Sequence, residues 1–172
     1  ETIRTEKKIC HYIDMPIQHA SDKILKAMGR RTNNAELRNI ISKLRKEIPD
    51  ICLRTTLITG FPGETEEDHQ ILLDFIDEME FDRLGVFTYS PEEDTKAASL
   101  DNQVDEEVKL CRKDEIMELQ QEISMDKSER LVGKEIEVII EGKASDEDVY
   151  VGRSYMDAPS VDGYVFINSE EE

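Results

Sequence analysis

The sequence predicts a mixed α/β protein: a parallel sheet with helical connections, then a long helix and a small all-β module. Between residues 8 and 90, three apolar segments typical of strands alternate with helical patterns. Connections of this length join parallel strands. From residue 133 onward the apolar residues alternate strictly, which is typical of a half-exposed strand. Since three strands cannot close a barrel, the first part is predicted to belong to a larger α/β unit.

The first predicted strand spans residues 8–17, and Pro16 lies at or beyond its end because proline cannot donate a ladder hydrogen bond. Ser21 can cap a short helix that ends before Gly29. A second helix is predicted from Asn34 to Ile48, directly before Pro49. These segments give the first strand and its helical crossover.

The central segment, residues 51–65, is predicted to be a buried strand, a glycine-bearing turn and a helix N-cap. Apolar and β-branched residues dominate residues 51–59, and the turn carries Gly60 and Gly63. Thr65 is a suitable N-cap, and three acidic residues follow where the helix dipole favours negative charge. A helix over residues 66–80 and a third strand over 83–90 complete the β-α-β-α-β order.

The second half of the chain is predicted to contain a polar loop (91–102), a helix (105–131) and three short strands. The helix has an apolar stripe that includes Val108, Ile116 and Ile123. The strands are predicted at residues 134–141, 148–154 and 163–168, too few for a closed barrel. We therefore expect domain boundaries at 1–101, 102–132 (the connecting helix) and 133–172.

Composition narrows the classes of function. The 172 residues contain 22 basic and 40 acidic side chains, a formal net charge of −18. This charge argues against direct nucleic-acid binding and favours a basic protein partner. No apolar run can cross a bilayer and no signal peptide is visible, so a cytoplasmic location is expected. The three cysteines lack metal-ligand spacing, which predicts no metal site and three small core residues.

Polar and aromatic residues gather at the carboxyl ends of the predicted strands, where α/β proteins bind ligands. The glycine turn lacks the lysine of a phosphate-binding loop, so nucleotide hydrolysis is not indicated. His11 and His69 are expected on a strand surface and on a solvent-facing helix turn. The candidate binding residues are Gln18, His19, Thr59, Gly60, Gly63, Glu64, Phe87 and Tyr89.

Six segments resemble the methylthiotransferase branch of radical S-adenosylmethionine enzymes, and together they cover nearly the whole chain. They are Asp14-Met-Pro-Ile-Gln-His-Ala-Ser-Asp22, Met28-Gly-Arg30, residues 54–68, Phe81-Asp-Arg-Leu-Gly-Val-Phe-Thr-Tyr-Ser90, Asp101-Asn-Gln-Val-Asp-Glu-Glu-Val108 and residues 117–124. Within this branch, Gly152-Arg-Ser-Tyr-Met-Asp-Ala-Pro-Ser-Val-Asp-Gly163 resembles the RimO type. That type adds a methylthio group to the β-carbon of an aspartate in the twelfth protein of the small ribosomal subunit.

The resemblance implies the C-terminal part of a TIM-like radical S-adenosylmethionine barrel, followed by an incomplete TRAM module. The full-length family uses S-adenosylmethionine and two [4Fe–4S] clusters, whose cysteine ligands are absent from this chain. By analogy, the strand-end residues line the S-adenosylmethionine cleft, with Gly60 and Gly63 near the adenine. Arg30 would pair with an acidic substrate or the methionine carboxylate, or form a surface ion pair. Asp94 stands where the family has glycine.

Other functions remain open from the sequence. They are a tRNA adenosine methylthiotransferase and a non-catalytic module that binds proteins through its acidic β segment. An aldolase-like barrel is less well supported, because no lysine lies at the strand ends. The basic ribosomal protein is the expected partner, without nucleic-acid or membrane binding. Because the cluster cysteines are missing, we expect the chain alone to bind no iron and to be inactive.

Overall fold

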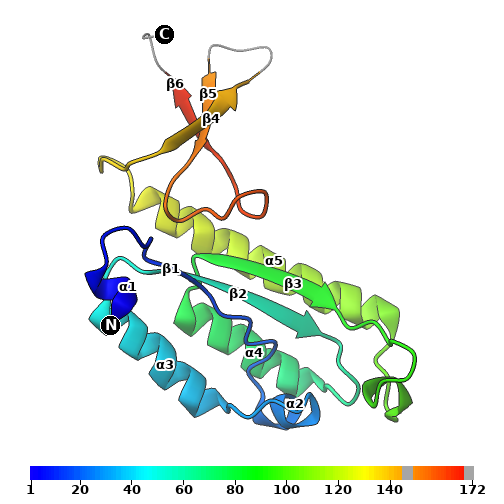
Figure 1. Cartoon of the computed structure of the whole chain (residues 1–172). Helices are drawn as coiled ribbons and strands as arrows, with labels where there is room; N and C mark the ends of the chain where they lie inside the picture. Colours follow the sequence, from blue (N-terminus) through cyan, green and yellow to red (C-terminus); the bar gives the residue numbers. More distant parts are fainter. Residues whose placement is uncertain (145–148, 169–172) are drawn as a thin grey trace.

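The computed structural model describes residues 1–144 and 149–168 and contains two separate three-stranded sheets (Figure 1). Asp148 and the acidic end at residues 170–172 lie outside the described residues. The elements are α1 (Thr2–Thr5), β1 (Tyr12–Asp14), α2 (Asp22–Ala27), α3 (Asn34–Glu47), β2 (Cys52–Thr59), α4 (Glu66–Met79), β3 (Arg83–Thr88), η1 (Ala97–Ser99), α5 (Glu106–Glu129), β4 (Ile139–Lys143), β5 (Val149–Arg153) and β6 (Val165–Asn168).

The first sheet is parallel, in the order β1-β2-β3, as the connections predict. Helices α3, α4 and α5 cover one of its faces. The main core lies between this face and the helices, where Leu53 and Leu57 of β2 pack with Ile41, Phe75 and Ile116. On the opposite face, Ile58 pairs with Phe87 of β3, and Phe87 is 62% exposed.

The second sheet is antiparallel, in the order β4-β5-β6, and lies beyond the end of α5 (Figure 1). The alternating pattern predicts a strand over residues 134–141, but β4 begins only at Ile139 and extends to Lys143. Every residue of β4 is exposed. Alternation therefore identified the strand, whereas its limits depend on which residues find a partner in β5.

The first predicted strand is also shorter than expected. The sequence predicts a strand over residues 8–17 with Pro16 at or beyond its end, whereas β1 contains only Tyr12–Asp14. Pro16 has no amide hydrogen to donate. Beyond it the chain returns to the sheet, because Gln18 forms an isolated parallel bridge with Leu57.

Two predictions about single side chains are wrong. His69 is buried in α4, with Nε2 at 2.7 Å from the Glu115 carboxylate of α5, and does not face solvent. Only Cys52 is a core residue, since Cys10 and Cys111 are exposed. His11 is half-buried beside Asp50, near the start of β1.

The buried stripe of α5 is only partly as predicted. Ile116 and Ile123 are buried, but Val108 is exposed and its neighbour Lys109 is buried instead. Among the described residues, no helix is long and apolar enough to cross a membrane.

Candidate functional site

The carboxyl ends of β2 and β3 lie at one edge of the sheet, where their arrowheads lie in Figure 1, and the Gln18 bridge that follows β1 reaches the same edge. Backbone hydrogen bonds join this edge. Gln18 donates to the Thr56 carbonyl at 3.0 Å, and Tyr89 donates to the Thr59 carbonyl at 2.8 Å. Gly60 follows Thr59 directly. Gln18, which follows β1, is therefore brought beside the ends of β2 and β3, the shared location that the sequence predicts for these residues.

A pocket of about 450 Å³ opens at this edge. The rings of Phe61 and Tyr89 meet edge to face there, with centroids 5.2 Å apart. The pocket thus combines an aromatic wall with polar and cationic side chains, as small-molecule sites do. Its lining residues are Gln18, Ala27, Met28, Gly29, Arg30, Ile58, Phe61, Tyr89, Lys96 and Ala97.

Gln18 adopts a left-handed backbone conformation, with φ of 73°. This conformation costs a non-glycine residue about 1–2 kcal/mol. The backbone holds Gln18 from both sides, since its amide donates to Thr56 and its carbonyl accepts from the Ile58 amide at 2.8 Å. Strained residues held in this way concentrate at ligand-binding sites.

The Glu64 carboxylate fixes the shape of the glycine turn through hydrogen bonds to its backbone. It accepts hydrogen bonds from the Gly60 amide at 2.7 Å, the Phe61 amide at 3.2 Å and the Thr59 hydroxyl at 3.2 Å. Arg112 of α5 donates to the same carboxylate at 3.0 Å. Both oxygens are engaged within the protein, so Glu64 is built to hold the turn.

His19 completes this buried network. Its Nε2 lies 3.6 Å from the Glu64 carboxylate, and its Nδ1 accepts from the Ser21 amide at 2.9 Å. Burial alone would raise the pKa of Glu64, but His19, Arg112 and the Gly60 amide outweigh it and hold that pKa below its ordinary value. Glu64 is therefore a carboxylate stabilised in its charged form.

The two glycines of the turn serve different needs. Both have positive φ, 75° at Gly60 and 83° at Gly63. A Cβ at Gly60 would overlap Cγ of Lys109 and lie 2.9 Å from its Cδ, whereas a Cβ at Gly63 would meet nothing within 4 Å. Gly60 is thus required by the close approach of α5 as well as by its backbone conformation.

The sequence predicts a solvated charged face for α5 and does not identify two of its cationic residues, Lys109 and Arg112, as buried. Lys109 is buried and donates to the Tyr89 carbonyl at 3.0 Å, with its ammonium 5.6 Å from the Tyr89 ring centre. Lys109 and Arg112 lie seven and four positions before Ile116, which places both on the same side of the helix as this buried residue. That spacing was the available signal.

The remaining candidates divide between the pocket and its surroundings. Phe87 lies on the open face of β3 and does not line the pocket. Arg30 lines the pocket and donates to the Pro16 carbonyl, and within the described residues it forms no ion pair. Asp94 has φ of 63°, a conformation that glycine adopts freely and aspartate tolerates.

The chain matches two family models, the Radical SAM superfamily over residues 1–76 and the TRAM domain over residues 132–172. It is 59% identical over all 172 residues to a protein of Lachnoclostridium phytofermentans named ribosomal protein uS12 methylthiotransferase RimO. It spans 39% of the length of that protein. A protein of the same name from Pelotomaculum thermopropionicum is 56% identical over 164 residues, covering 95% of this chain and 37% of that protein.

Proposed function

The chain belongs to the RimO-type radical S-adenosylmethionine methylthiotransferases, and we propose that it supplies the S-adenosylmethionine pocket of such an enzyme. The proposed substrate is an aspartate of ribosomal protein uS12, which receives a methylthio group on its β-carbon. The observation that carries the proposal is the pocket at the joined strand ends, lined by Gln18, Phe61 and Tyr89. A tRNA-modifying enzyme and a non-catalytic module are not favoured, since the matched relatives are named for uS12.

The lining residues suit the parts of S-adenosylmethionine. Phe61 and Ile58 offer apolar surface to the adenine. The side-chain carboxamide of Gln18 can hydrogen-bond the adenine or the ribose. Tyr89 lines the pocket, but its hydroxyl is buried within the protein and has no hydrogen-bond partner among the described residues. Arg30, at the pocket wall, would pair with the methionine carboxylate or with the substrate aspartate.

The residues behind the pocket have a supporting role in this proposal. Thr59, His19 and Glu64 are buried at 0%, 0% and 5% exposure, and they hold the Gly60–Gly63 turn. Of this turn, Phe61 lines the pocket and Gly60 and Gly63 do not, so contact of the two glycines with the adenine stays a prediction. Direct contact of these three side chains with the cofactor stays a prediction. Their hydrogen bonds support a role in positioning the turn.

The described residues do not fit an iron–sulfur cluster. In that part of the chain, no three His, Cys, Asp or Glu side chains are grouped closely enough to hold a metal ion. When bound, S-adenosylmethionine supplies the radical and the methyl group in this class of enzyme. The residues at hand would bind the cofactor, orient it and exclude water.

The proposed partner is a basic ribosomal protein in the cytoplasm. A net charge of −18 favours association with a positively charged surface and disfavours a bare polyanion. This attraction should weaken as salt is added.

The cofactor proposal is tested by calorimetric titration of S-adenosylmethionine into the 172-residue chain and into Gln18→Ala. Loss of one ligand hydrogen bond, worth about 0.5–1.5 kcal/mol, should weaken binding about 2- to 13-fold. The matched control is Gln70→Ala, because Gln70 is exposed on α4 and its side chain donates to Asp74, outside the pocket. Equal affinity of Gln18→Ala and the control, or no binding to the unaltered chain, would contradict the proposal.

A further inference from the structure

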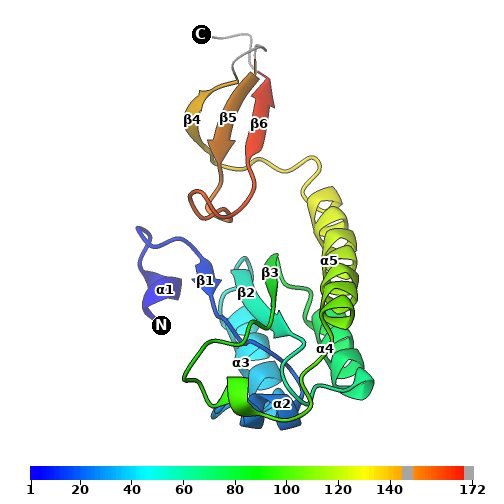
Figure 2. The same ribbon diagram turned by 90° about the vertical axis from the view of Figure 1, so that its right-hand side faces the viewer.

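The loop that joins β5 to β6, residues 154–164, lies against the amino ends of the parallel strands. Figure 2 shows this orange loop pointing from the second sheet toward the ends of β1, β2 and β3. These ends are opposite to the cofactor pocket. In α/β barrels the amino ends of the strands serve stability and not catalysis. A contact here can therefore fix the second sheet without obstructing the pocket.

Two aspartates of this loop carry the contact. Asp157 pairs with Nη2 of Arg83, at the start of β3, at 2.5 Å. Asp162 accepts from the Tyr12 hydroxyl at 3.0 Å and lies 3.4 Å from Nε of Arg54. Both carboxylates are almost completely buried, at 4% and 5% exposure. A surface ion pair contributes little, but a buried one requires its partner in a defined place.

The same two aspartates also shape the loop itself. Asp157 accepts from the Ser154 amide at 3.1 Å and from the Ser154 hydroxyl at 2.7 Å. Asp162 accepts from the Ala158 amide at 2.8 Å. Each carboxylate thus uses one set of bonds to fold the loop and another to bind the parallel sheet. The loop is preorganised for this contact, which lowers the entropy lost on docking.

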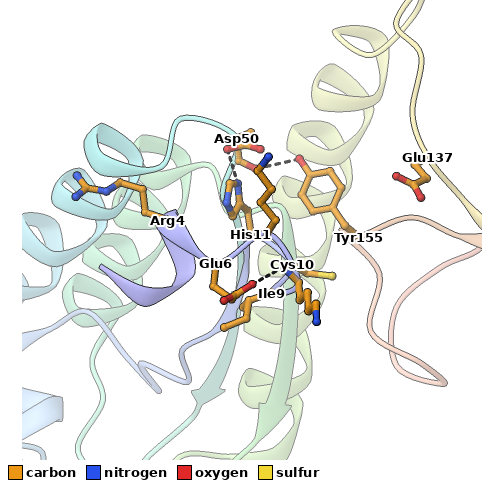
Figure 3. A pocket seen from close by; sticks show the side chains of 10 residues that line it. Arg4, Glu6, Ile9, Cys10, His11, Asp50, Glu137 and Tyr155 are labelled. Carbon is orange, nitrogen blue, oxygen red and sulfur yellow. Dashed lines mark hydrogen bonds and ion pairs between the residues drawn. The ribbon is translucent and has the colours of Figure 1, made fainter.

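A third contact lies beside the aspartates. The Tyr155 hydroxyl donates to the Asp50 carbonyl at 2.9 Å, and Asp50 is held by His11 at 2.7 Å. Figure 3 shows Tyr155 reaching across to Asp50 and His11 at the rim of a pocket of about 430 Å³. This pocket is lined by the amino-terminal segment and by both modules, and it marks where they meet.

We infer that residues 154–164 form a latch that fixes the β4–β5–β6 sheet to the amino ends of the parallel strands. Asp157 and Asp162 are its two anchoring side chains, and Arg83, Arg54 and Tyr12 receive them. Domains joined by one linker normally move relative to each other. The latch adds a second connection to that of α5, so the two sheets behave as one body. If the proposed function holds, the latch keeps the β4–β5–β6 sheet at a constant distance from the cofactor pocket.

The latch is tested by nuclear magnetic relaxation of backbone amides in the 172-residue chain. In the unaltered chain, amides of β4–β6 and of β1–β3 should give one common rotational correlation time. In the Asp157→Asn/Asp162→Asn chain, the β4–β6 amides should report a shorter correlation time than the β1–β3 amides. The β1–β3 amides should keep the value that they have in the unaltered chain. The asparagines can still accept the loop's own hydrogen bonds, so the loop need not unfold.

The matched control is Asp74→Asn/Glu78→Gln, which also removes two negative charges. Asp74 and Glu78 are exposed on α4, where they contact Gln70 and Arg38, and none of these residues lines the pocket where the modules meet. This control should retain one correlation time. A second variant, Arg54→Gln/Arg83→Gln, leaves the loop sequence intact and should release the sheet in the same way.

Separate tumbling in the unaltered chain would overturn the latch, as would a common correlation time in both altered pairs. If the β4–β6 amides lose their dispersion in both pairs while β1–β3 is unchanged, the sheet needs the docked loop in order to fold, which supports the latch. None of these outcomes involves cofactor or substrate. Failure of the latch is thus distinguishable from failure of the proposed function.

Discussion

Replacing Gly60 by alanine should cost more in the unaltered chain than in a chain that already carries Lys109→Ala. The added methyl group would meet two obstacles. One is the positive φ of 75°, which costs an alanine roughly 1–2 kcal/mol. The other is the Lys109 stem, which the new Cβ would overlap. Overpacking of this kind costs roughly 1–3 kcal/mol.

The two contributions separate in a double-mutant cycle measured by urea unfolding. Gly60→Ala alone should lose about 2–5 kcal/mol of unfolding free energy, the sum of the two costs. In the Lys109→Ala background most of the overlap is gone, so the loss should fall to about 1–2 kcal/mol. The expected coupling is therefore about 1–3 kcal/mol.

Gly63→Ala is the matched control for this cycle. Gly63 has an equally positive φ of 83°, but nothing lies within 4 Å of an added Cβ. Its cost should be about 1–2 kcal/mol in both backgrounds, with no coupling to Lys109. Additive costs for Gly60→Ala and Lys109→Ala would refute the close packing of α5 on the turn. Equal coupling at Gly63 would refute it too.

Three further outcomes are expected. The Gln18→Gly chain should unfold at a higher urea concentration than the Gln18→Ala chain, because glycine relieves the backbone strain of the left-handed conformation, roughly 1–2 kcal/mol. An equal or lower urea midpoint for Gln18→Gly would contradict strain at this position. Stability should fall as the pH drops below 4.5, because the lowered pKa of Glu64 in the folded chain gives a stabilising contribution above its ordinary pKa. That contribution is lost as the pH falls through the folded pKa. Urea titrations of Glu64→Gln should show a shallower dependence, and an unchanged slope would argue against this. Disulfide reagents at neutral pH should modify the exposed Cys10 thiol rapidly. They should modify Cys52 only on unfolding, because Cys52 is buried and burial raises its pKa to about 12. Rapid modification of all three thiols would contradict the fold.

The parallel sheet and its strand-end site could be predicted because their signals are local. The alternation of apolar strands and amphipathic helices gives the β-α-β-α-β order. Gly60 and Gly63 mark the turn, and Thr65 marks the helix start, where it forms a capping box with Asp68. Since parallel strands end at one edge, Gln18 and Tyr89 could be placed together without coordinates.

The parts that could not be predicted depend on contacts between distant residues. Lys109 and Arg112 look like ordinary solvated charges until α5 is placed over the glycine turn. Asp157 and Asp162 look like loop residues until their arginine partners, 74 and 108 positions away, are known. No local pattern predicts that a buried charge has found its partner.

The central claim is that the strand-end pocket holds S-adenosylmethionine, and amide chemical shifts test it most directly. When the cofactor is titrated into isotope-labelled chain, the amides of Gln18, Gly60 and Tyr89 should shift together. Those of Cys10 and Tyr155, at the other end of the strands, should not. Shifts confined to Cys10 and Tyr155, or none at saturating cofactor, would contradict the account.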